Sequence, residues 1–167
     1  MKPFVFCPAC ATKLENPDPS EDGARCPNCG RTWYRNSAPT AGAAIVRDGR
    51  VLLAVRGVEP HKGKFDLPGG FLQAGEEPVA GVKREVREET GLEIDVSMED
   101  CLQIVPHEYG GEGDYVLAIG FKARHVSGEP SAASDVADVR WVGKKELDDL
   151  DFAWEHDRQL ARRALGE

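Results

Sequence analysis

Short apolar runs separated by glycine and polar residues predict a strand-rich chain beyond residue 40. Residues 43–46 and 51–56 are the first two runs. Arg47-Asp48-Gly49-Arg50 lies between them, and a central Asp-Gly is typical of a tight hairpin turn. Further strands are expected at residues 92–96, 102–107, 115–123 and 136–142. The glycine-rich acidic segment 109–114 is expected to be a loop.

Helical periodicity appears in the middle of the chain and again near its end. Val79, Val82 and Val86 recur at helical spacing, which predicts one face packed against a core. Pro78 suits the first turn of this helix and Gly91 suits its C-terminal end. A short helix is expected at residues 144–149 and a longer one at 155–165, with Leu160, Ala161, Ala164 and Leu165 on an apolar face. Strands combined with helices on their faces indicate an α/β sandwich.

Glu85, Glu88 and Glu89 fall on one side of the first expected helix, because each residue advances about 100° around the helix axis. Like charges at this spacing destabilise a helix by roughly a few tenths of a kcal/mol per pair. Bound Mg²⁺ or Mn²⁺ would remove that cost, since both ions prefer oxygen ligands. The alternative is an ordinary solvated acidic face, neutralised by the basic residues interspersed with the glutamates.

The glycine-rich segment before this helix extends the pattern. Leu67-Pro68-Gly69-Gly70 is followed, after five more residues, by Glu76 and then, after seven, by Arg84-Glu85-Val86-Arg87-Glu88-Glu89-Thr90-Gly91-Leu92. This spacing resembles the signature of the Nudix hydrolases, in which a glycine and a glutamate precede an REUxEExGU block, U being a bulky aliphatic residue. The resemblance implies an α/β/α sandwich with a mixed sheet. It also implies metal-dependent hydrolysis of a diphosphate linked to a nucleoside or another group.

The resemblance also implies a set of site residues. The carbonyl of Gly69 and the carboxylates of Glu85, Glu88 and Glu89 would bind Mg²⁺ or Mn²⁺. Arg84 is expected to orient a carboxylate by ion pairing rather than to touch substrate.

The general base has two leading alternatives, Glu85 within the signature and Asp135 in a later loop. Glu76 either completes the outer part of the metal site or interacts with the helix dipole. Asp138 is expected on the same edge as Asp135, and the loop alternatives are Glu112, Asp114 and Glu129.

Four cysteines near the start of the chain form a second pattern. Cys7-Pro-Ala-Cys10 and Cys26-Pro-Asn-Cys29 are separated by fifteen residues, a spacing that suits tetrahedral Zn²⁺. Disulfides are the competing interpretation, but neither a signal peptide nor a membrane-spanning apolar stretch is recognisable, so a reducing, cytoplasmic location is expected. Cys101 is expected to be a buried thiol on a strand.

We expect the cysteines to hold a zinc ribbon over residues 1–36, followed by a Nudix domain over residues 37–167. A piece this small cannot bury a sufficient core, so zinc would keep it folded. Nucleic acid is not an expected partner, because the ribbon carries Glu15, Asp18, Glu21 and Asp22 and the chain has a net charge of −8. Nor is a membrane expected, whereas a homodimer is possible.

A four-cysteine ribbon before a Nudix domain resembles the NADH pyrophosphatase group and small enzymes acting on ADP-ribose or FAD. The NADH group carries an SQPWPFPxS segment that this chain lacks; residues 102–109 read Leu-Gln-Ile-Val-Pro-His-Glu-Tyr. The expected substrate is therefore ADP-ribose or a related dinucleotide. A MutT-like nucleoside triphosphate pyrophosphatase is the enzymatic alternative. A nucleotide-sensing regulatory module is the alternative of another class.

Three aromatic side chains are considered for stacking on a base, namely Tyr109, Phe121 and Trp154. Core packing is the preferred interpretation for Phe121. His107 is expected to be a hydrogen-bonded strand residue rather than a catalyst.

Overall fold

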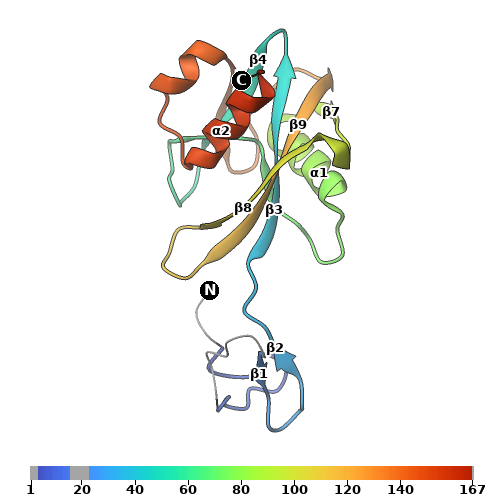
Figure 1. Ribbon diagram of the computed structural model, residues 1–167, viewed down its shortest axis with the longest axis vertical. Helices are drawn as coiled ribbons and strands as arrows, with labels where there is room; N and C mark the ends of the chain where they lie inside the picture. Colours follow the sequence, from blue (N-terminus) through green and yellow to red (C-terminus); the bar gives the residue numbers. More distant parts are fainter. Residues whose placement is uncertain (1–3, 16–22, 167) are drawn as a thin grey trace.

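The computed structural model describes residues 4–15 and 23–166, which contain two β-sheets. The larger sheet has eight strands, and its main path runs in the order β10-β4-β3-β9-β7 (Figure 1). Its strands are β3 (Ala38–Arg47), β4 (Arg50–Arg56), β5 (Phe65–Asp66), β6 (Gly69–Phe71), β7 (Glu93–Asp95), β8 (Cys101–Glu108), β9 (Tyr115–Ser127) and β10 (Val136–Gly143). The smaller sheet pairs β1 (Ala24–Arg25) with β2 (Thr32–Trp33).

Pairing within the large sheet is mixed, as predicted. β3 runs parallel to β9 over nine register pairs, from Ala38 opposite Val116 to Val46 opposite Arg124, whereas its pairings with β4 and β6 are antiparallel. The β3–β4 hairpin turns at Asp48 and Gly49, whose φ angles of 51° and 71° match the turn expected from Asp-Gly.

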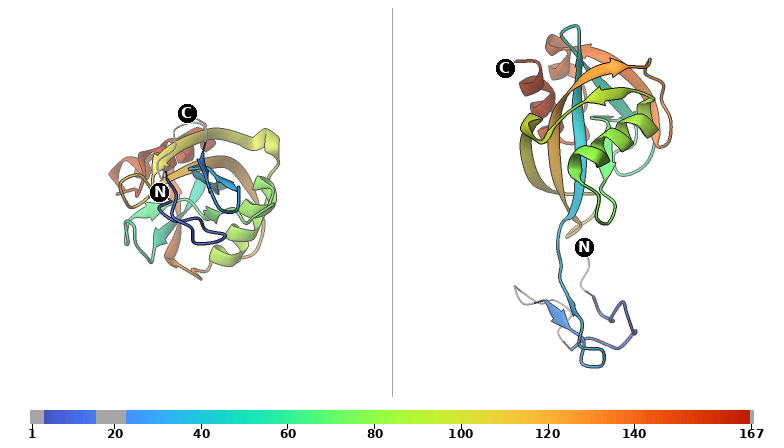
Figure 2. Two further views of the ribbon diagram at one scale, coloured as in Figure 1. Left: turned by 90° about the horizontal axis from the view of Figure 1, so that it is seen from below. Right: turned by 90° about the vertical axis from the view of Figure 1, so that its right-hand side faces the viewer.

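Helices cover both faces of this sheet, which gives the α/β/α layers. α1 (Pro78–Thr90) and α2 (Glu155–Ala164) lie on opposite sides of β3 and β9 (Figures 1 and 2). Alternation along the strands explains the two cores, because successive side chains point to opposite faces. Ile45 of β3 belongs to the core that contains Val82 of α1, whereas Ala44 belongs to the core that contains Leu160 of α2.

α1 begins and ends where its sequence indicates. Pro78 occupies the first turn, and Gly91 closes the helix in the left-handed conformation with its N–H donating to the carbonyl oxygen of Arg87. Val82 and Val86 are fully buried in the core shared with β3 and β9, so this stripe anchors the helix against the sheet.

Several element boundaries differ from the sequence expectations. β3 begins five residues earlier than expected because its first half pairs with both β6 and β9. Two very short strands, β5 and β6, were not predicted. The short helix expected at residues 144–149 is present as a 3₁₀ helix, Lys144–Asp149. Cys101 lies on β8 but is only partly buried, so the expectation of a buried thiol is wrong.

In the described part of the chain, no helix combines the length and apolar character that membrane crossing would require. Asp18, Glu21 and Asp22, on which the expectation about nucleic acid partly depends, lie outside the described residues.

Candidate functional site

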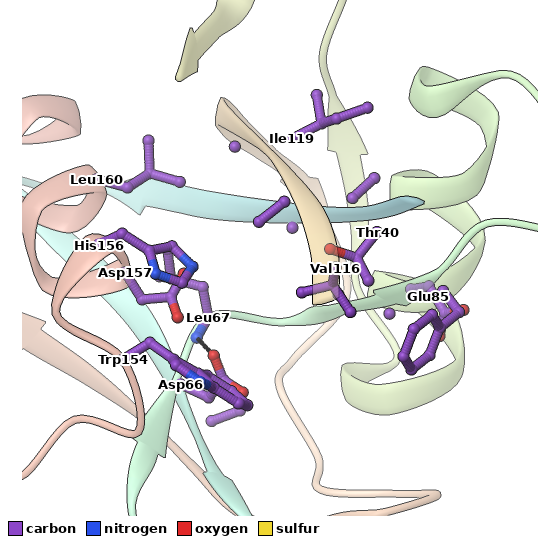
Figure 3. A pocket seen from close by; sticks show the side chains of 18 of the residues that line it. Thr40, Asp66, Leu67, Glu85, Val116, Ile119, Trp154, His156, Asp157 and Leu160 are labelled. Carbon is purple, nitrogen blue, oxygen red and sulfur yellow. Dashed lines mark hydrogen bonds and ion pairs between the residues drawn. The ribbon is translucent and has the colours of Figure 1, made fainter. Parts of the chain in front are cut away.

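A cavity of about 410 Å³ opens where β3, β4 and the loop before β6 approach α1 and α2. Figure 3 shows Glu85 of α1 across this cavity from Asp66, Trp154 and Asp157, with Thr40 between the two sides. The cavity therefore has an acidic side near α1 and an aromatic side near the start of α2.

The acidic side is organised around a buried glutamate. Glu89 is only 6% exposed, and the backbone N–H of Gly69 donates to its Oε2 at 2.9 Å. Burial, followed by the negative charges of Asp135, Glu85 and Asp66, raises the pKa of Glu89 to about 9, although the Gly69 hydrogen bond opposes this shift. A carboxylate held in such a place is stabilised by a nearby cation.

Glu85 approaches the backbone so closely that only glycine fits opposite it. A Cβ atom on Gly70 would lie 2.7 Å from the carboxyl carbon of Glu85 and 2.8 Å from its Oε2. The second glycine of the loop therefore makes room for this carboxylate. Gly69 is equally constrained, since its φ is 155° and a Cβ there would meet the Ala41 carbonyl oxygen at 2.3 Å.

Arg84 ties the glutamates of α1 together. Its guanidinium donates to Glu85 Oε1 at 2.6 Å, to Glu88 Oε2 at 3.2 Å and to both carboxylate oxygens of Glu76 at 2.8 Å. These hydrogen bonds and the N–H of Gln73 lower the pKa of Glu76 to about 2. The expected ion pairing of Arg84 is thus present, and Glu76 belongs to the same network.

The other expected acids divide into two groups. Asp135 lines the cavity, and the loop that carries it is fixed by hydrogen bonds from the Ala133 N–H to the Glu89 carbonyl and from the Gly57 N–H to the Asp135 carbonyl. Glu88 does not line the cavity and its side chain is 55% exposed. The loop acids Glu112, Asp114 and Glu129 and the β10 residue Asp138 also lie outside the cavity lining.

The aromatic side is built from residues that are distant in sequence. The rings of Tyr109 and Trp154 stack at an interplanar angle of 17° with centroids 5.4 Å apart. Arg56 lies over Trp154 at 4.8 Å from the ring centroid, donates to the Tyr109 hydroxyl at 3.2 Å and forms an ion pair with Asp66 at 2.7 Å. Phe121 is instead fully buried in the core, as expected.

Two histidines and an aspartate complete this side. His107 of β8 stacks near His156 of α2, with ring centroids 4.3 Å apart, and both line the cavity. Burial, followed by the nearby His107, lowers the pKa of His156 to about 4, so His156 is neutral at physiological pH. Asp157 lies beside it and shares a hydrogen bond with Asp66.

Sequence reasoning did not identify Arg56, Asp66, His156 or Asp157 as site residues. Each is an unremarkable residue within a strand or helix, and no motif links them. Only the pairing of β4 with β5 and the position of α2 bring them together. Trp154 is the one weak indication in the sequence, because it is a candidate for stacking on a base and directly precedes α2.

The acidic side suits a hard divalent cation by the chemistry of its donors, because it offers carboxylate oxygens and a glycine-rich backbone. Its geometry is open. Among the described residues, the acidic side chains do not supply three oxygens within 4.8 Å of one another. The two carboxylates that line the cavity have separate partners, because Arg84 holds Glu85 and the Gly69 N–H holds Glu89.

The four cysteines form a closed group instead. Their sulfur atoms all lie within 4.8 Å of one another, with Cys7–Cys29 at 3.7 Å and Cys10–Cys26 at 3.6 Å. Zn–S bonds of about 2.3 Å in a tetrahedron place sulfurs roughly 3.8 Å apart, whereas a disulfide requires about 2.05 Å. The cluster can therefore hold a metal ion, and the disulfide alternative does not fit.

The two Cys-x-x-Cys turns have the same backbone geometry. The N–H of Ala11 donates to the Cys7 carbonyl at 2.8 Å, and the N–H of Gly30 donates to the Cys26 carbonyl at 3.0 Å. Both residues are left-handed, with φ of 58° and 73°. Gly30 thus makes the sharp reversal expected after the second pair.

The chain is an α/β sandwich whose cavity has a glycine loop and an acidic helix on one side and stacked aromatic rings on the other, an arrangement typical of a small-molecule site. The family is shown by the NUDIX domain model, which matches residues 36–164. The chain therefore belongs to the NUDIX domain family.

Known relatives agree with this membership. NudC of Pseudomonas aeruginosa, an NAD-capped RNA hydrolase, is 33% identical over 165 residues, which cover 96% of this chain and 54% of NudC. The chain thus spans about half the length of that relative. The ADP-ribose pyrophosphatase of Methanocaldococcus jannaschii is 31% identical over 125 residues, 75% of this chain and 72% of that protein.

A solved structure supports the fold. The NUDIX hydrolase from Nitrosomonas europaea superposes with a TM-score of 0.78 at 24% sequence identity, covering 99% of this chain and 90% of that one. At this identity the likeness shows the architecture alone.

Proposed function

We propose that this protein is a metal-dependent Nudix hydrolase that cleaves the diphosphate of a nucleoside diphosphate-linked compound, with ADP-ribose or a related dinucleotide as substrate. The observation that carries the proposal is one cavity lined by Glu85, Glu89 and Asp135 on one side and by Tyr109 and Trp154 on the other. The first group suits a metal-bound diphosphate, and the second suits a ring system attached to it.

Gly69, Glu85, Glu88 and Glu89 are the proposed ligands of Mg²⁺ or Mn²⁺. Such an ion, when bound, would neutralise phosphate oxygens and acidify a water molecule. Glu85 and Glu89 face the cavity, so they are the central pair. Glu88 is the outermost member, because it lies outside the lining and shares Arg84 with Glu85.

Arg84 positions these carboxylates. It holds Glu85 and Glu88 from one guanidinium and is itself fixed by two hydrogen bonds to Glu76. The same guanidinium donates to the Phe71 carbonyl at 3.2 Å, which connects the helix to the glycine loop. This network keeps the ligands in place without contacting substrate.

Asp135 is our proposed general base, with Glu85 as the alternative. Asp135 lines the cavity, and its negative charge acts on Glu89, so its carboxylate lies near the proposed metal. It would accept a proton from the water that attacks phosphorus. Replacing Asp135 with Asn should lower kcat by about a hundredfold or more. Near-normal kcat on the preferred substrate would assign the role to Glu85.

The cysteine cluster is proposed to hold structural Zn²⁺ in a ribbon spanning residues 1–36, ahead of a Nudix domain spanning 37–167. Support comes from the sulfur distances, which fit a tetrahedral ion. We further propose a cytoplasmic protein whose partner is a small nucleotide rather than nucleic acid or membrane, with a homodimer possible. NudC acts on NAD-capped RNA, so such an RNA belongs among the substrates tested.

A substrate panel tests the proposed function. Metal-loaded protein would be assayed with ADP-ribose, NADH, FAD, NAD-capped RNA, dinucleoside polyphosphates and nucleoside triphosphates, in oxygen-18 water. ADP-ribose should yield AMP and ribose 5-phosphate, and the label identifies the phosphorus attacked. Preference for triphosphates would support the MutT-like alternative. Tight nucleotide binding without turnover of any member would support the sensing module.

A further inference from the structure

The aromatic side of the cavity contains more carboxyl groups than positive charges to balance them. Both oxygens of Asp66 accept a hydrogen bond, Oδ2 from Arg56 at 2.7 Å and Oδ1 from the Leu67 N–H at 2.8 Å. Asp157 reaches the same place from α2, and its carboxyl group points towards Asp66 (Figure 3). One guanidinium therefore faces two carboxyl groups.

Charge balance requires one of the two acids to be neutral, because an unpaired buried carboxylate is costly. The ion pair with Arg56 selects Asp66 as the charged member. His156 does not compensate Asp157: its Nε2 lies 3.5 Å from Oδ1 of Asp157, but the buried ring is neutral. Burial, and then the charge of Asp66, raises the pKa of Asp157 well above its usual range.

A protonated Asp157 has a definite hydrogen-bonding pattern. Its O–H donates to the Asp66 carboxylate, so its other oxygen is a carbonyl that can only accept. Asp157 lines the cavity, and 13% of its side-chain surface stays accessible to a ligand. The stacked Tyr109 and Trp154 and the ring of His107 line the same cavity.

We propose that Asp157 determines nucleobase specificity in this cavity, with its carbonyl oxygen accepting a hydrogen bond from an amino or ring N–H group of the base. This deepens the proposed function by naming the residue that would read the base end of the substrate. Adenine, guanine and cytosine carry exocyclic amino groups that can make this bond. A ligand that ends in a sugar phosphate has no ring that can stack on the neighbouring aromatic side chains. It also has no N–H group in the plane of such a ring that could donate a hydrogen bond to Asp157.

The proposal makes an unusual prediction for two substitutions of the same residue. In Asp157→Asn the amide N–H donates to Asp66 and the amide carbonyl accepts from the base, so both bonds of the neutral acid are reproduced. Asp157→Leu keeps the branching at Cγ, with bulkier methyl groups in place of the oxygens, and makes neither bond. If Asp157 were instead ionised and acted as a base or a metal ligand, both substitutions would abolish that role.

The test measures equilibrium binding, so it does not depend on turnover. Calorimetry would compare AMP, GMP, CMP and UMP with ribose 5-phosphate, and the readout is the ratio of Kd values between ribose 5-phosphate and the best mononucleotide. We expect a ratio above about ten in the original chain, retained in Asp157→Asn and reduced about tenfold in Asp157→Leu. Glu99→Leu, an exposed acid outside the cavity, is the matched control and should keep the original ratio.

Infrared difference spectroscopy provides a second measurement that needs only the Asn variant to fold. The spectrum of the original chain minus Asp157→Asn at neutral pH should show the carbonyl band of a protonated carboxyl group. That band should shift to lower frequency when the preferred mononucleotide binds. A carboxylate band instead, an Asn variant as weak as the Leu variant, or no preference for any base would overturn the proposal. Base-dependent binding without hydrolysis of any substrate would refute the proposed function and leave this inference standing.

Discussion

The cysteine cluster and the acidic helix both offer ligands to a cation, yet the protein prepares them in opposite ways. The cysteine sulfurs already lie 3.6 to 3.7 Å apart in two pairs, close to the edge of a zinc–thiolate tetrahedron. The carboxylates of α1 that line the cavity instead have separate partners, because Arg84 holds Glu85 and the Gly69 N–H holds Glu89. A closed ligand set leaves no room for substrate, whereas an open one does. We therefore propose a structural use for the first group and a chemical use for the second.

The origin of the ligands differs in the same way. Each Cys-x-x-Cys turn is a local structure, so short-range hydrogen bonds such as Ala11 N–H to the Cys7 carbonyl and Gly30 N–H to the Cys26 carbonyl position the sulfurs. The cavity combines α1, the loop before β6 and the loop carrying Asp135, so its geometry depends on the whole sandwich. Damage to the two centres should therefore have different consequences.

Loss of a cysteine should produce the largest effect. Cys26→Ser removes a buried ligand from a segment too small to bury a core of its own, so the segment should lose its metal and its folded structure. Thermal unfolding with NMR detection would show this as loss of dispersed signals from residues 4–15 and 23–33, while signals of the α/β sandwich persist. Unfolding of both parts together would contradict the separation.

The next largest effect is expected at the buried glutamate. Glu89→Gln removes a carboxyl group that a bound cation would keep ionised despite its raised pKa, and loss of metal-assisted charge stabilisation worth several kcal/mol should lower kcat by about a thousandfold. Glu88→Gln is the matched control on the same helix face, and its 55% exposed side chain should make the loss much smaller. Steady-state kinetics on the preferred substrate would compare them. Equal losses of kcat in the two variants would contradict this difference and make Glu88 as important to the site as Glu89.

A smaller loss of kcat is expected when a methyl group is added to the glycine-rich loop that precedes α1. Gly70→Ala introduces a Cβ only 2.7 Å from the Glu85 carboxyl carbon, so this carboxylate must move. A displacement of about 1 Å can cost roughly a hundredfold in rate. Gly75→Ala provides the control, because nothing lies within 4 Å of its Cβ position, although its φ of 80° adds backbone strain. Thermal stability measures the backbone strain in Gly75→Ala, and kcat measures the effect of displacing Glu85 in Gly70→Ala. Similar kcat values for the two variants would contradict the role assigned to Gly70.

The smallest effect concerns the backbone of the cysteine turns. Ala11 adopts φ of 58°, which costs about 1 kcal/mol or slightly more in a residue with a side chain. Ala11→Gly should therefore tighten zinc binding several-fold, and Gly30→Ala should weaken it by a similar factor. Competition with a zinc chelator measures both. Weaker zinc binding in Ala11→Gly, or tighter binding in Gly30→Ala, would show that the two turns are not equivalent.

Local patterns in the sequence predicted the features that depend on nearby residues. The Asp48-Gly49 turn, the Gly91 helix end and the valine stripe of α1 follow from propensity and spacing. The short strands β5 and β6 escaped prediction because two or three residues carry no periodicity. Their existence depends on pairing with β4 and β3.

The site shows the same division. Glu85, Glu89 and Gly69 belong to one continuous motif, so their proximity was predictable. Arg56 and Asp157 are about a hundred residues apart in sequence, and only the completed sandwich brings them to one cavity. Their chemistry depends on burial and on a shared neighbour, Asp66, neither of which a motif records.

The central claim is that one chain carries two cation sites with separate tasks, and metal reconstitution tests it most directly. Protein stripped of metal would be titrated with Zn²⁺ and with Mg²⁺, separately and together, while NMR follows folding and a product assay follows turnover. Zn²⁺ alone should restore the signals of residues 4–15 and 23–33 without turnover, and turnover should appear only when Mg²⁺ is added. Turnover with Zn²⁺ alone at the stoichiometry of the cysteine cluster, or folding of that segment by Mg²⁺, would contradict the account.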